Sequence, residues 1–154
     1  MNKTKVLFMG RKPVAAKSLN WLLHNEYVEV IGVITDSQFE KSPTKQIADD
    51  HNVPIFDFAD TLELMKSGSL SFDLGLSMLY WRKLKDEFIS LPTLGTVNFH
   101  PAPLPNYKGT AGYNMAILDG LNTWGMTAHY VDDEIDTGEI IQVLEFPICK
   151  DTET

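Results

Sequence analysis

Cysteine, long apolar runs and basic residues are scarce in this chain, and each scarcity argues against a class of protein. Cys149 is the only cysteine in 154 residues, so a disulfide within the chain is impossible and a reducing cytoplasm suits it. No stretch approaches the roughly 18 apolar residues of a membrane-spanning helix. Lysine and arginine number 13 against 21 aspartate and glutamate, and the net charge of −8 disfavours a partner bound through its phosphate backbone. We therefore expect a cytoplasmic protein with no membrane partner, and the charge disfavours a nucleic-acid partner without excluding one.

The remaining composition is that of an ordinary globular protein, with 44% hydrophobic and 22% charged residues. The length predicts a single domain spanning residues 1–154, which is large enough to bury a hydrophobic core. Residues 151–154, Asp-Thr-Glu-Thr, have the pattern of a helix cap with an acidic first turn. Because the sequence stops there, we expect a domain truncated at its carboxyl terminus, with a sheet face left bare for a homodimer or for missing sequence.

Apolar runs and helical periodicity alternate along the chain. The runs predict strands at residues 5–9, 28–35, 53–56, 72–79, 96–99, 125–131 and 139–148. Between them, the periodicity predicts helices at residues 13–23, 45–51, 59–66, 81–90 and 111–120. This order indicates an α/β fold of the Rossmann-like, doubly wound kind, with a mostly parallel sheet and helices on both faces. Ligands of such sheets bind outside the carboxyl ends of the strands.

Three polar residues stand out against this pattern. Asn98 and His100 lie at the carboxyl end of the predicted strand 96–99, and Asp136 follows within Asp-Thr-Gly. An amide, an imidazole and a carboxylate suit the transfer of an acyl group to an amine. The amide can donate a hydrogen bond to a developing oxyanion, the imidazole can handle protons, and the carboxylate can orient the imidazole. We take these three residues as the candidate catalytic set.

The segment after His100, residues 101–109, carries proline at alternate positions and is predicted to be a stiff loop. One interpretation is a rigid connection only. The other is a wall that holds His100 and presents Tyr107 and Lys108 to an entering substrate.

These motifs, from residues 95–105 through residue 138, resemble the catalytic core of the folate-dependent formyltransferases. Members of that family carry an Asn-x-His strand end, a proline-rich loop ending in a basic residue and glycine, a helix, and a loop with Asp-x-Gly. This sequence has each in order, with Lys108 where many members have arginine. The resemblance covers roughly residues 4–150 and is specific over about 73–141.

The resemblance implies an enzyme with 10-formyltetrahydrofolate as formyl donor and a primary amine as acceptor. By position, Asn98 and His100 would stabilise the tetrahedral intermediate, while Asp136 would pair with His100 and help move a proton from the amine to the folate nitrogen. Loop segments of the family that contact the pterin correspond here to Leu79, Tyr80, Trp81, Val131, Asp132, Asp133 and Ile135.

The acceptor is predicted to be a nucleotide-linked amino sugar. The acidic net charge and the lack of a second domain weigh against methionyl-tRNA, which stays an alternative together with glycinamide ribonucleotide. Aromatic and cationic side chains are expected at the mouth of the site, namely Arg11, Lys12, Tyr107, Lys108 and Tyr113. A non-catalytic or truncated relative that binds ligand without turnover is the rival class.

Two further signals are weaker. His129 lies in a predicted strand, where a packed or hydrogen-bonded role is commoner than a catalytic one. A zinc site made by His100, His129 and Asp136 is disfavoured because no pair has the usual short ligand spacing, so we expect no metal. The turn at Arg11 and Lys12 can hold a phosphate but lacks the Gly-x-Gly-x-x-Gly of dinucleotide-binding proteins, and a solvated turn is the alternative.

Overall fold

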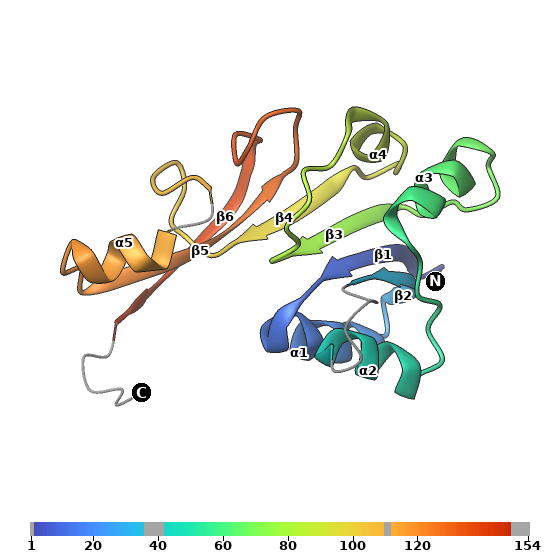
Figure 1. Cartoon of the computed structure of the whole chain (residues 1–154), viewed down its shortest axis with the longest axis horizontal. Coiled ribbons are helices and arrows are strands. Elements are labelled where there is room, and N and C mark those ends of the chain that lie inside the picture. The colour runs from blue at the N-terminus through green and yellow to red at the C-terminus, as the bar shows by residue number, and fades with distance from the viewer. Residues whose placement is uncertain (1, 36–41, 110–111, 149–154) are drawn as a thin grey trace.

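The computed structural model describes residues 2–35, 42–109 and 112–148, without the side chain of Tyr113. One sheet has the strand order β2-β1-β3-β4-β5-β6 (Figure 1). The strands are β1 (Thr4–Gly10), β2 (Val28–Ile34), β3 (Leu74–Met78), β4 (Thr96–His100), β5 (Thr123–Tyr130) and β6 (Ile140–Pro147). The helices are α1 (Lys12–Leu23), α2 (Pro43–Asp50), α3 (Phe58–Lys66), α4 (Asp86–Ser90) and α5 (Gly112–Leu118).

The sheet is mostly parallel. β1 pairs in parallel with both β2 and β3, and β3 pairs in parallel with β4. β5 pairs antiparallel with β4 and with β6, so β5 alone runs against the other strands of this sheet. The chain leaves β1 to one side toward β2 and later returns to the other side as β3, which is the reversal of a doubly wound fold. The predicted fold class is confirmed.

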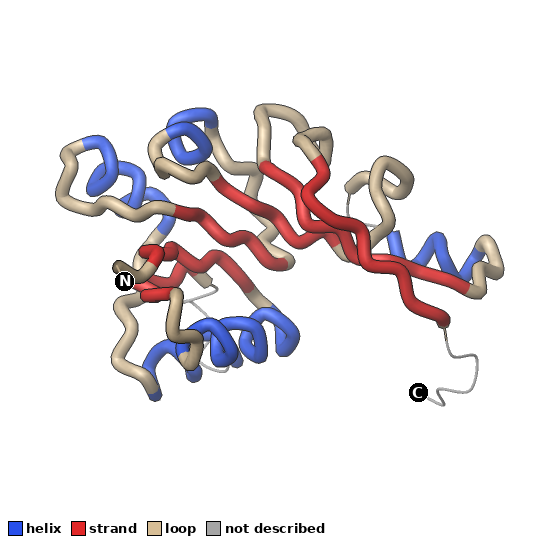
Figure 2. Tube along the Cα trace, turned by 180° about the vertical axis from the view of Figure 1, so that it is seen from behind, coloured by secondary structure: helices blue, strands red, loops and turns tan. Residues whose placement is uncertain are grey.

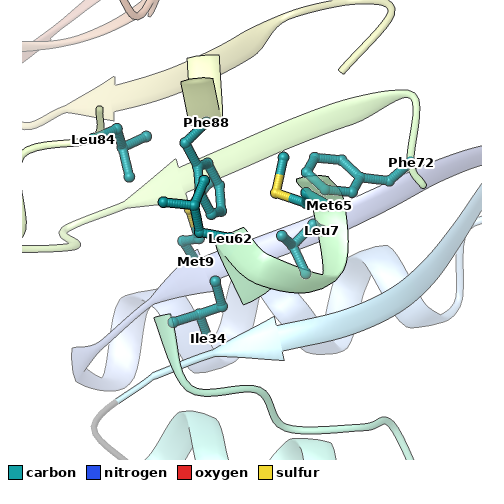
Figure 3. Close-up of a cluster of buried hydrophobic side chains, with 8 residues drawn as sticks. All are labelled: Leu7, Met9, Ile34, Leu62, Met65, Phe72, Leu84 and Phe88. Carbon is teal, nitrogen blue, oxygen red and sulfur yellow. The ribbon is translucent and has the colours of Figure 1, made fainter. Parts of the chain in front are cut away.

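Helices cover both faces of the sheet because the side chains of β1 alternate between them. Leu7 and Met9 pack on one face with Leu62 and Met65 of α3 and Phe88 of α4 (Figure 3). Phe88 also stacks on Phe58, with ring centroids 5.1 Å apart. Phe8 points to the opposite face and packs with Leu19 of α1. Figure 2 shows the helices on the two faces of the sheet from behind. These two clusters fix the ends of β1 and β3, from which the loops of the site depart.

Local signals explain where the helices begin. Pro13 stands in the first turn of α1, where a missing N–H costs nothing. The Ser42 hydroxyl accepts the Lys45 amide at the start of α2, and the Asp57 carboxylate accepts the Ala59 amide at the start of α3. Within the described part of the chain, no helix has the length and apolar character to cross a membrane.

Two sequence predictions were wrong in detail. The strand expected at residues 53–56 is a single bridge between Ile55 and Val33, because Pro54 has no N–H to extend a ladder. The helix expected at residues 81–90 begins only at Asp86. Tertiary contacts order residues 81–85 instead: the Arg82 guanidinium lies 5.7 Å from the ring centroid of Phe58 in α3, and Leu84 is buried in the core.

Candidate functional site

A cavity of about 440 Å³ opens at the carboxyl ends of β1, β3 and β4. Its position matches the rule that ligands of open α/β sheets bind beside the point where the strand order reverses. The lining residues are Arg11, Lys12, Leu79, Tyr80, Trp81, Lys83, Asn98, Phe99, His100, Pro101, Gly109, Ile135 and Asp136. All three predicted catalytic residues are among them.

The pairing of β4 with β5 brings a second histidine to this set. Asn98 lies opposite His129 in the antiparallel register, and His100 lies opposite Thr127. Since directly opposed residues share a face, the side chains of Asn98 and His129 meet, with Asn98 Nδ2 3.2 Å from His129 Nε2. The His129 ring is turned by its other nitrogen, because Nδ1 donates to the Tyr130 carbonyl oxygen at 2.8 Å.

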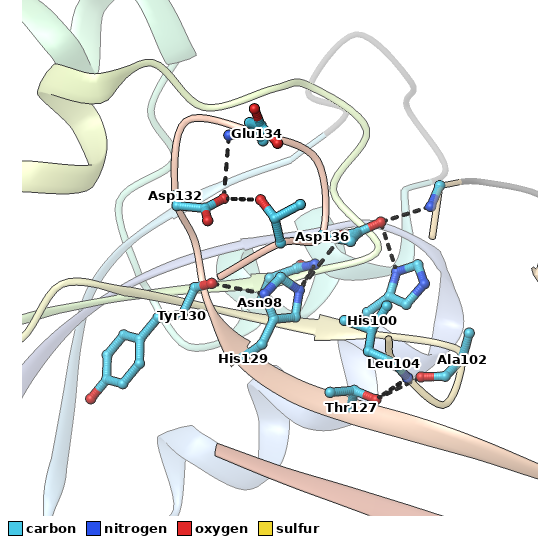
Figure 4. A network of polar contacts seen from close by, with 12 residues as sticks. Asn98, His100, Ala102, Leu104, Thr127, His129, Tyr130, Asp132, Glu134 and Asp136 are labelled. Atoms are coloured by element: carbon cyan, nitrogen blue, oxygen red, sulfur yellow. Dashed lines mark hydrogen bonds and ion pairs between the residues drawn. The ribbon is translucent and has the colours of Figure 1, made fainter. Parts of the chain in front are cut away.

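Asp136 lies between the two imidazoles (Figure 4). Its Oδ2 atom is 3.4 Å from His100 Nδ1, and its Oδ1 atom is 3.6 Å from His129 Nε2. The Gly109 amide also donates to Oδ2 at 2.8 Å. Each carboxylate oxygen therefore faces one histidine, and the carboxylate links β4, β5 and the proline-rich loop.

Internal hydrogen bonds and a close backbone contact fix the shape of the loop that carries Asp136. The Asp132 carboxylate accepts the Thr137 hydroxyl at 2.6 Å and the Glu134 amide at 3.2 Å, which closes the loop on itself. A Cβ at Gly138 would overlap the Tyr130 carbonyl oxygen, so only glycine lets the loop return this close to the end of β5. The Asp-Thr-Gly motif is thus explained by loop geometry as well as by its carboxylate.

Thr127 holds the start of the proline-rich loop. Its hydroxyl donates to the Ala102 carbonyl at 2.7 Å and accepts the Leu104 amide at 3.0 Å. Further along, the Tyr107 carbonyl accepts His100 Nε2–H at 2.9 Å. Because a carbonyl only accepts, this contact assigns a proton to Nε2 and leaves Nδ1 facing Asp136.

The buried charges of this network shift two pKa values. Burial of Asp136 favours its neutral form, but hydrogen bonds from His129 and the Gly109 amide, with the charges of His100 and His129, outweigh burial and lower its pKa. Burial likewise works against the charged form of His129. The hydrogen bonds to Asp136 and to the Tyr130 carbonyl, with the charges of Asp136 and Asp132, raise the His129 pKa on balance.

The backbone is strained at several lining positions. Lys12, Leu79 and Asp136 have φ of 76°, 52° and 55°, in the left-handed region that L-residues with side chains seldom adopt. Such strain costs of order 1–3 kcal/mol per residue and collects at binding sites, where the surrounding structure enforces it.

The other predicted site residues divide between the cavity and its surroundings. Those that line the cavity are Arg11, Lys12, Leu79, Tyr80, Trp81 and Ile135. Val131 instead packs against the core under α3 and α4. The Asp132 carboxylate accepts a hydrogen bond within its own loop, and Asp133 is exposed. The Tyr107 ring packs on Trp124, with centroids 4.9 Å apart, while Lys108 is exposed. The side chain of Tyr113 lies outside the described part of the structure.

Sequence reasoning missed two residues of the site, Thr127 and Lys83, and it expected for His129 the packed or hydrogen-bonded role without its place beside Asn98 and Asp136. The alternation of β5 places its odd-numbered residues on one face, but the register against β4 that sets them beside Asn98 and His100 has no signature in a single sequence. Lys83 was assigned to a helix, and its place at the cavity follows from the irregular course of residues 81–85.

The charge of the cavity contrasts with that of the chain. Arg11, Lys12 and Lys83 line it, whereas Asp136 is the only lining carboxylate among the residues that the structure describes, in a chain of net charge −8. This local excess of cations suits an anionic ligand. Within the described ranges, no cluster of three or more histidine, cysteine or acidic side chains has an arrangement that could hold a metal ion.

Comparison with known proteins places this geometry in a family. The formyl transferase family model matches residues 3–154. Methionyl-tRNA formyltransferase of Clostridioides difficile is 31% identical over 148 residues, which cover 89% of this chain and 48% of that protein. The enzyme of the same name from Bacteroides fragilis is 33% identical over 161 residues, covering 94% of this chain and 48% of its own. The chain thus spans about half the length of the curated relatives it matches.

The fold has solved counterparts as well. Glycinamide ribonucleotide transformylase 1 from Symbiobacterium toebii superposes with a TM-score of 0.80 at 19% identity, over 96% of this chain and 75% of that one. At this level of identity the likeness concerns the fold alone.

Proposed function

The chain belongs to the formyl transferase family, and we propose on that basis that it transfers a formyl group from 10-formyltetrahydrofolate to a primary amine. The observation that carries the proposal is the convergence of Asn98, His100 and Asp136 on one cavity wall. We further propose that residues 1–154 act as one catalytic domain. The donor supplies the reactive formyl group when it is bound.

The cavity has the chemistry that such a donor requires. Its volume of about 440 Å³ is within the range of small-molecule sites. Tyr80 and Trp81 offer aromatic surface for a flat pterin ring, and Ile135 adds apolar surface beside Asp136. We propose that the loops at residues 79–81 and 131–135 hold the donor. Of the latter, Ile135 lines the cavity.

Each polar residue has a proposed role that its contacts support. The Asn98 amide can donate to the oxygen that gains negative charge as the amine attacks. The His100 imidazole can stabilise that charge or pass a proton, with Asp136 fixing its orientation from 3.4 Å. The lowered pKa of Asp136 keeps this carboxylate charged, so it favours a positive charge on the imidazole during transfer.

A nucleotide-linked amino sugar is the acceptor that we propose. Its diphosphate would meet the cations of the rim, Arg11, Lys12 and Lys83, while its amine reaches the wall with Asn98 and His100. The predicted contacts of Lys108 and Tyr113 with this acceptor remain part of the proposal. For Tyr107, the backbone carbonyl that binds His100 is the proposed contribution, since its ring packs on Trp124.

Methionyl-tRNA is the second candidate acceptor, because the curated relatives at 31% and 33% identity are named methionyl-tRNA formyltransferases. The two candidates differ in salt dependence. Binding of a nucleotide sugar through one diphosphate weakens modestly with salt, whereas binding of a tRNA through several phosphates weakens steeply.

The test is a formyl transfer assay with isotopically labelled 10-formyltetrahydrofolate and three acceptors: a panel of nucleotide amino sugars, charged initiator tRNA and glycinamide ribonucleotide. We expect turnover of a nucleotide amino sugar, and Asn98→Ala should lower kcat more than it raises KM. Turnover of tRNA alone would replace the acceptor but keep the reaction. Donor binding without transfer to any acceptor would favour the non-catalytic alternative.

A further inference from the structure

His129 is the most deeply buried titratable side chain of the network, with 2% of its surface exposed. Its Nδ1 atom is committed to the Tyr130 carbonyl, at 2.8 Å. A carbonyl oxygen accepts only, so Nδ1 carries a proton in every protonation state of this arrangement. Only Nε2 remains variable, and it faces two groups at once: Nδ2 of the Asn98 amide at 3.2 Å and Oδ1 of the Asp136 carboxylate at 3.6 Å.

The state of Nε2 decides how the Asn98 amide lies. Without a proton, Nε2 accepts an N–H from the Asn98 amide, and its lone pair faces the Asp136 carboxylate, which is repulsive. With a proton, Nε2–H faces the carboxylate. The Asn98 amide, whose Nδ2 atom faces Nε2 in this structure, then makes a half-turn that brings its oxygen toward the imidazolium. The two ends of an amide have nearly the same shape, so a half-turn of the side chain needs little space.

We propose that His129 is a positioning residue, which as an imidazolium anchors Asp136 and turns the Asn98 amide so that its NH₂ group faces the cavity. This inference rests on the proposed formyl transfer, in which Asn98 must donate rather than accept. A neutral His129 would draw the NH₂ group to itself and leave the amide oxygen toward the reacting oxygen. His129 thereby acts through Asn98 and Asp136, without touching substrate.

The charged groups around His129 favour its imidazolium form. Asp136 faces Nε2 from the loop between β5 and β6, and Asp132 of the same loop adds negative charge. His100, from β4, is the opposing group, with its ring centroid 6.4 Å away. His100 keeps its own partners in the Tyr107 carbonyl and Asp136, so the carboxylate stands between the two rings.

Kinetics of His129 variants test the proposal. His129→Ala should lower kcat at least tenfold and leave KM for both substrates within threefold, because only the transition-state contact of Asn98 is misdirected. His129→Gln keeps an amide N–H for Asp136 and should recover most of the rate. In the parent, kcat should fall as pH rises through the His129 pKa, and the Gln variant should lack that limb.

Two measurements separate this proposal from failure of the proposed function. Combining His129→Ala with Asn98→Ala should lower kcat no further than Asn98→Ala alone, since both changes remove one contact. Independently of turnover, nitrogen-resolved NMR of the chain without substrates should show protons on both His129 nitrogens at pH 6. A neutral His129 at that pH, or a kcat of His129→Ala within twofold of an active parent, overturns the proposal. If the parent transfers no formyl group at all, the proposed reaction fails while NMR still decides the state of His129.

Discussion

Thr127 offers the sharpest test of how the proline-rich loop is held. The side chain is fully buried, and its hydroxyl makes two hydrogen bonds, with the Ala102 carbonyl at 2.7 Å and the Leu104 amide at 3.0 Å. Thr127→Val keeps the shape of the side chain and removes both bonds. The two backbone groups are then left without their partner in a site closed to water.

The expected cost follows from these contacts. A buried backbone group that loses its hydrogen-bond partner costs about 1–3 kcal/mol, and Thr127→Val leaves two such groups. We expect Thr127→Val to lower the free energy of unfolding by about 3 kcal/mol, a large share of the 5–15 kcal/mol typical of a domain. The matched control is Thr127→Ser, which keeps the hydroxyl and loses one methyl group, for a cost of about 1 kcal/mol.

Urea unfolding followed by tryptophan fluorescence measures both variants, with the buried Trp124 as a reporter close to the loop. The denaturant slope should stay unchanged, because the surface exposed on unfolding is the same. Equal losses in the Val and Ser variants would show that the methyl group, not the hydroxyl, holds the loop. A loss below about 1 kcal/mol in Thr127→Val would refute the hydrogen-bond argument altogether.

Three further predictions concern the carboxylate loop and His100. Asp136→Asn should destabilise most between pH 3.8 and 6.5, in denaturant titrations at several pH values. The raised pKa of His129 stabilises the folded protein fully below pH 6.5, and this stabilisation is lost as pH rises through the folded pKa. The lowered pKa of Asp136 stabilises the folded protein above pH 3.8, and this stabilisation is lost as pH falls through the folded pKa. Gly138→Ala should lower the thermal midpoint, since its methyl group overlaps the Tyr130 carbonyl; an unchanged midpoint contradicts this. His100→Ala should abolish formyl transfer in a folded chain, and activity within about tenfold of the parent, a loss of about 1.4 kcal/mol, excludes the proposed role.

Much of the fold was predictable because its signals are local. The apolar run at the start of the chain and the helical spacing of Ala15, Leu19 and Leu22 correspond to β1 and α1, which bury these residues. The errors have one local and one tertiary cause. Pro54, which has no N–H, limits its segment to a bridge, whereas the packing of Arg82 on Phe58 and the burial of Leu84 replace an expected helix.

The site was predictable in part, for a different reason. Asn98 and His100 stand at the end of a strand, and Asp136 stands in a loop motif, so the sequence points to each residue separately. The position of His129 beside these residues depends on the pairing between β4 and β5, which is non-local. The Tyr107 ring illustrates the converse: the sequence placed it near the site, but only the packing on Trp124 shows where it points.

The register of β5 ties the stability of the sheet to the geometry of the site. Alternation along β5 sends Trp124 into a cluster with Ala116 of α5, and the same alternation presents Thr127 and His129 to the opposite face. A slip of one residue would exchange the two sets, leaving the indole without its apolar cluster and Asn98 without its imidazole. The burial of Trp124 therefore selects the register that assembles the polar network. No separate interaction is needed to bring His129 beside Asn98.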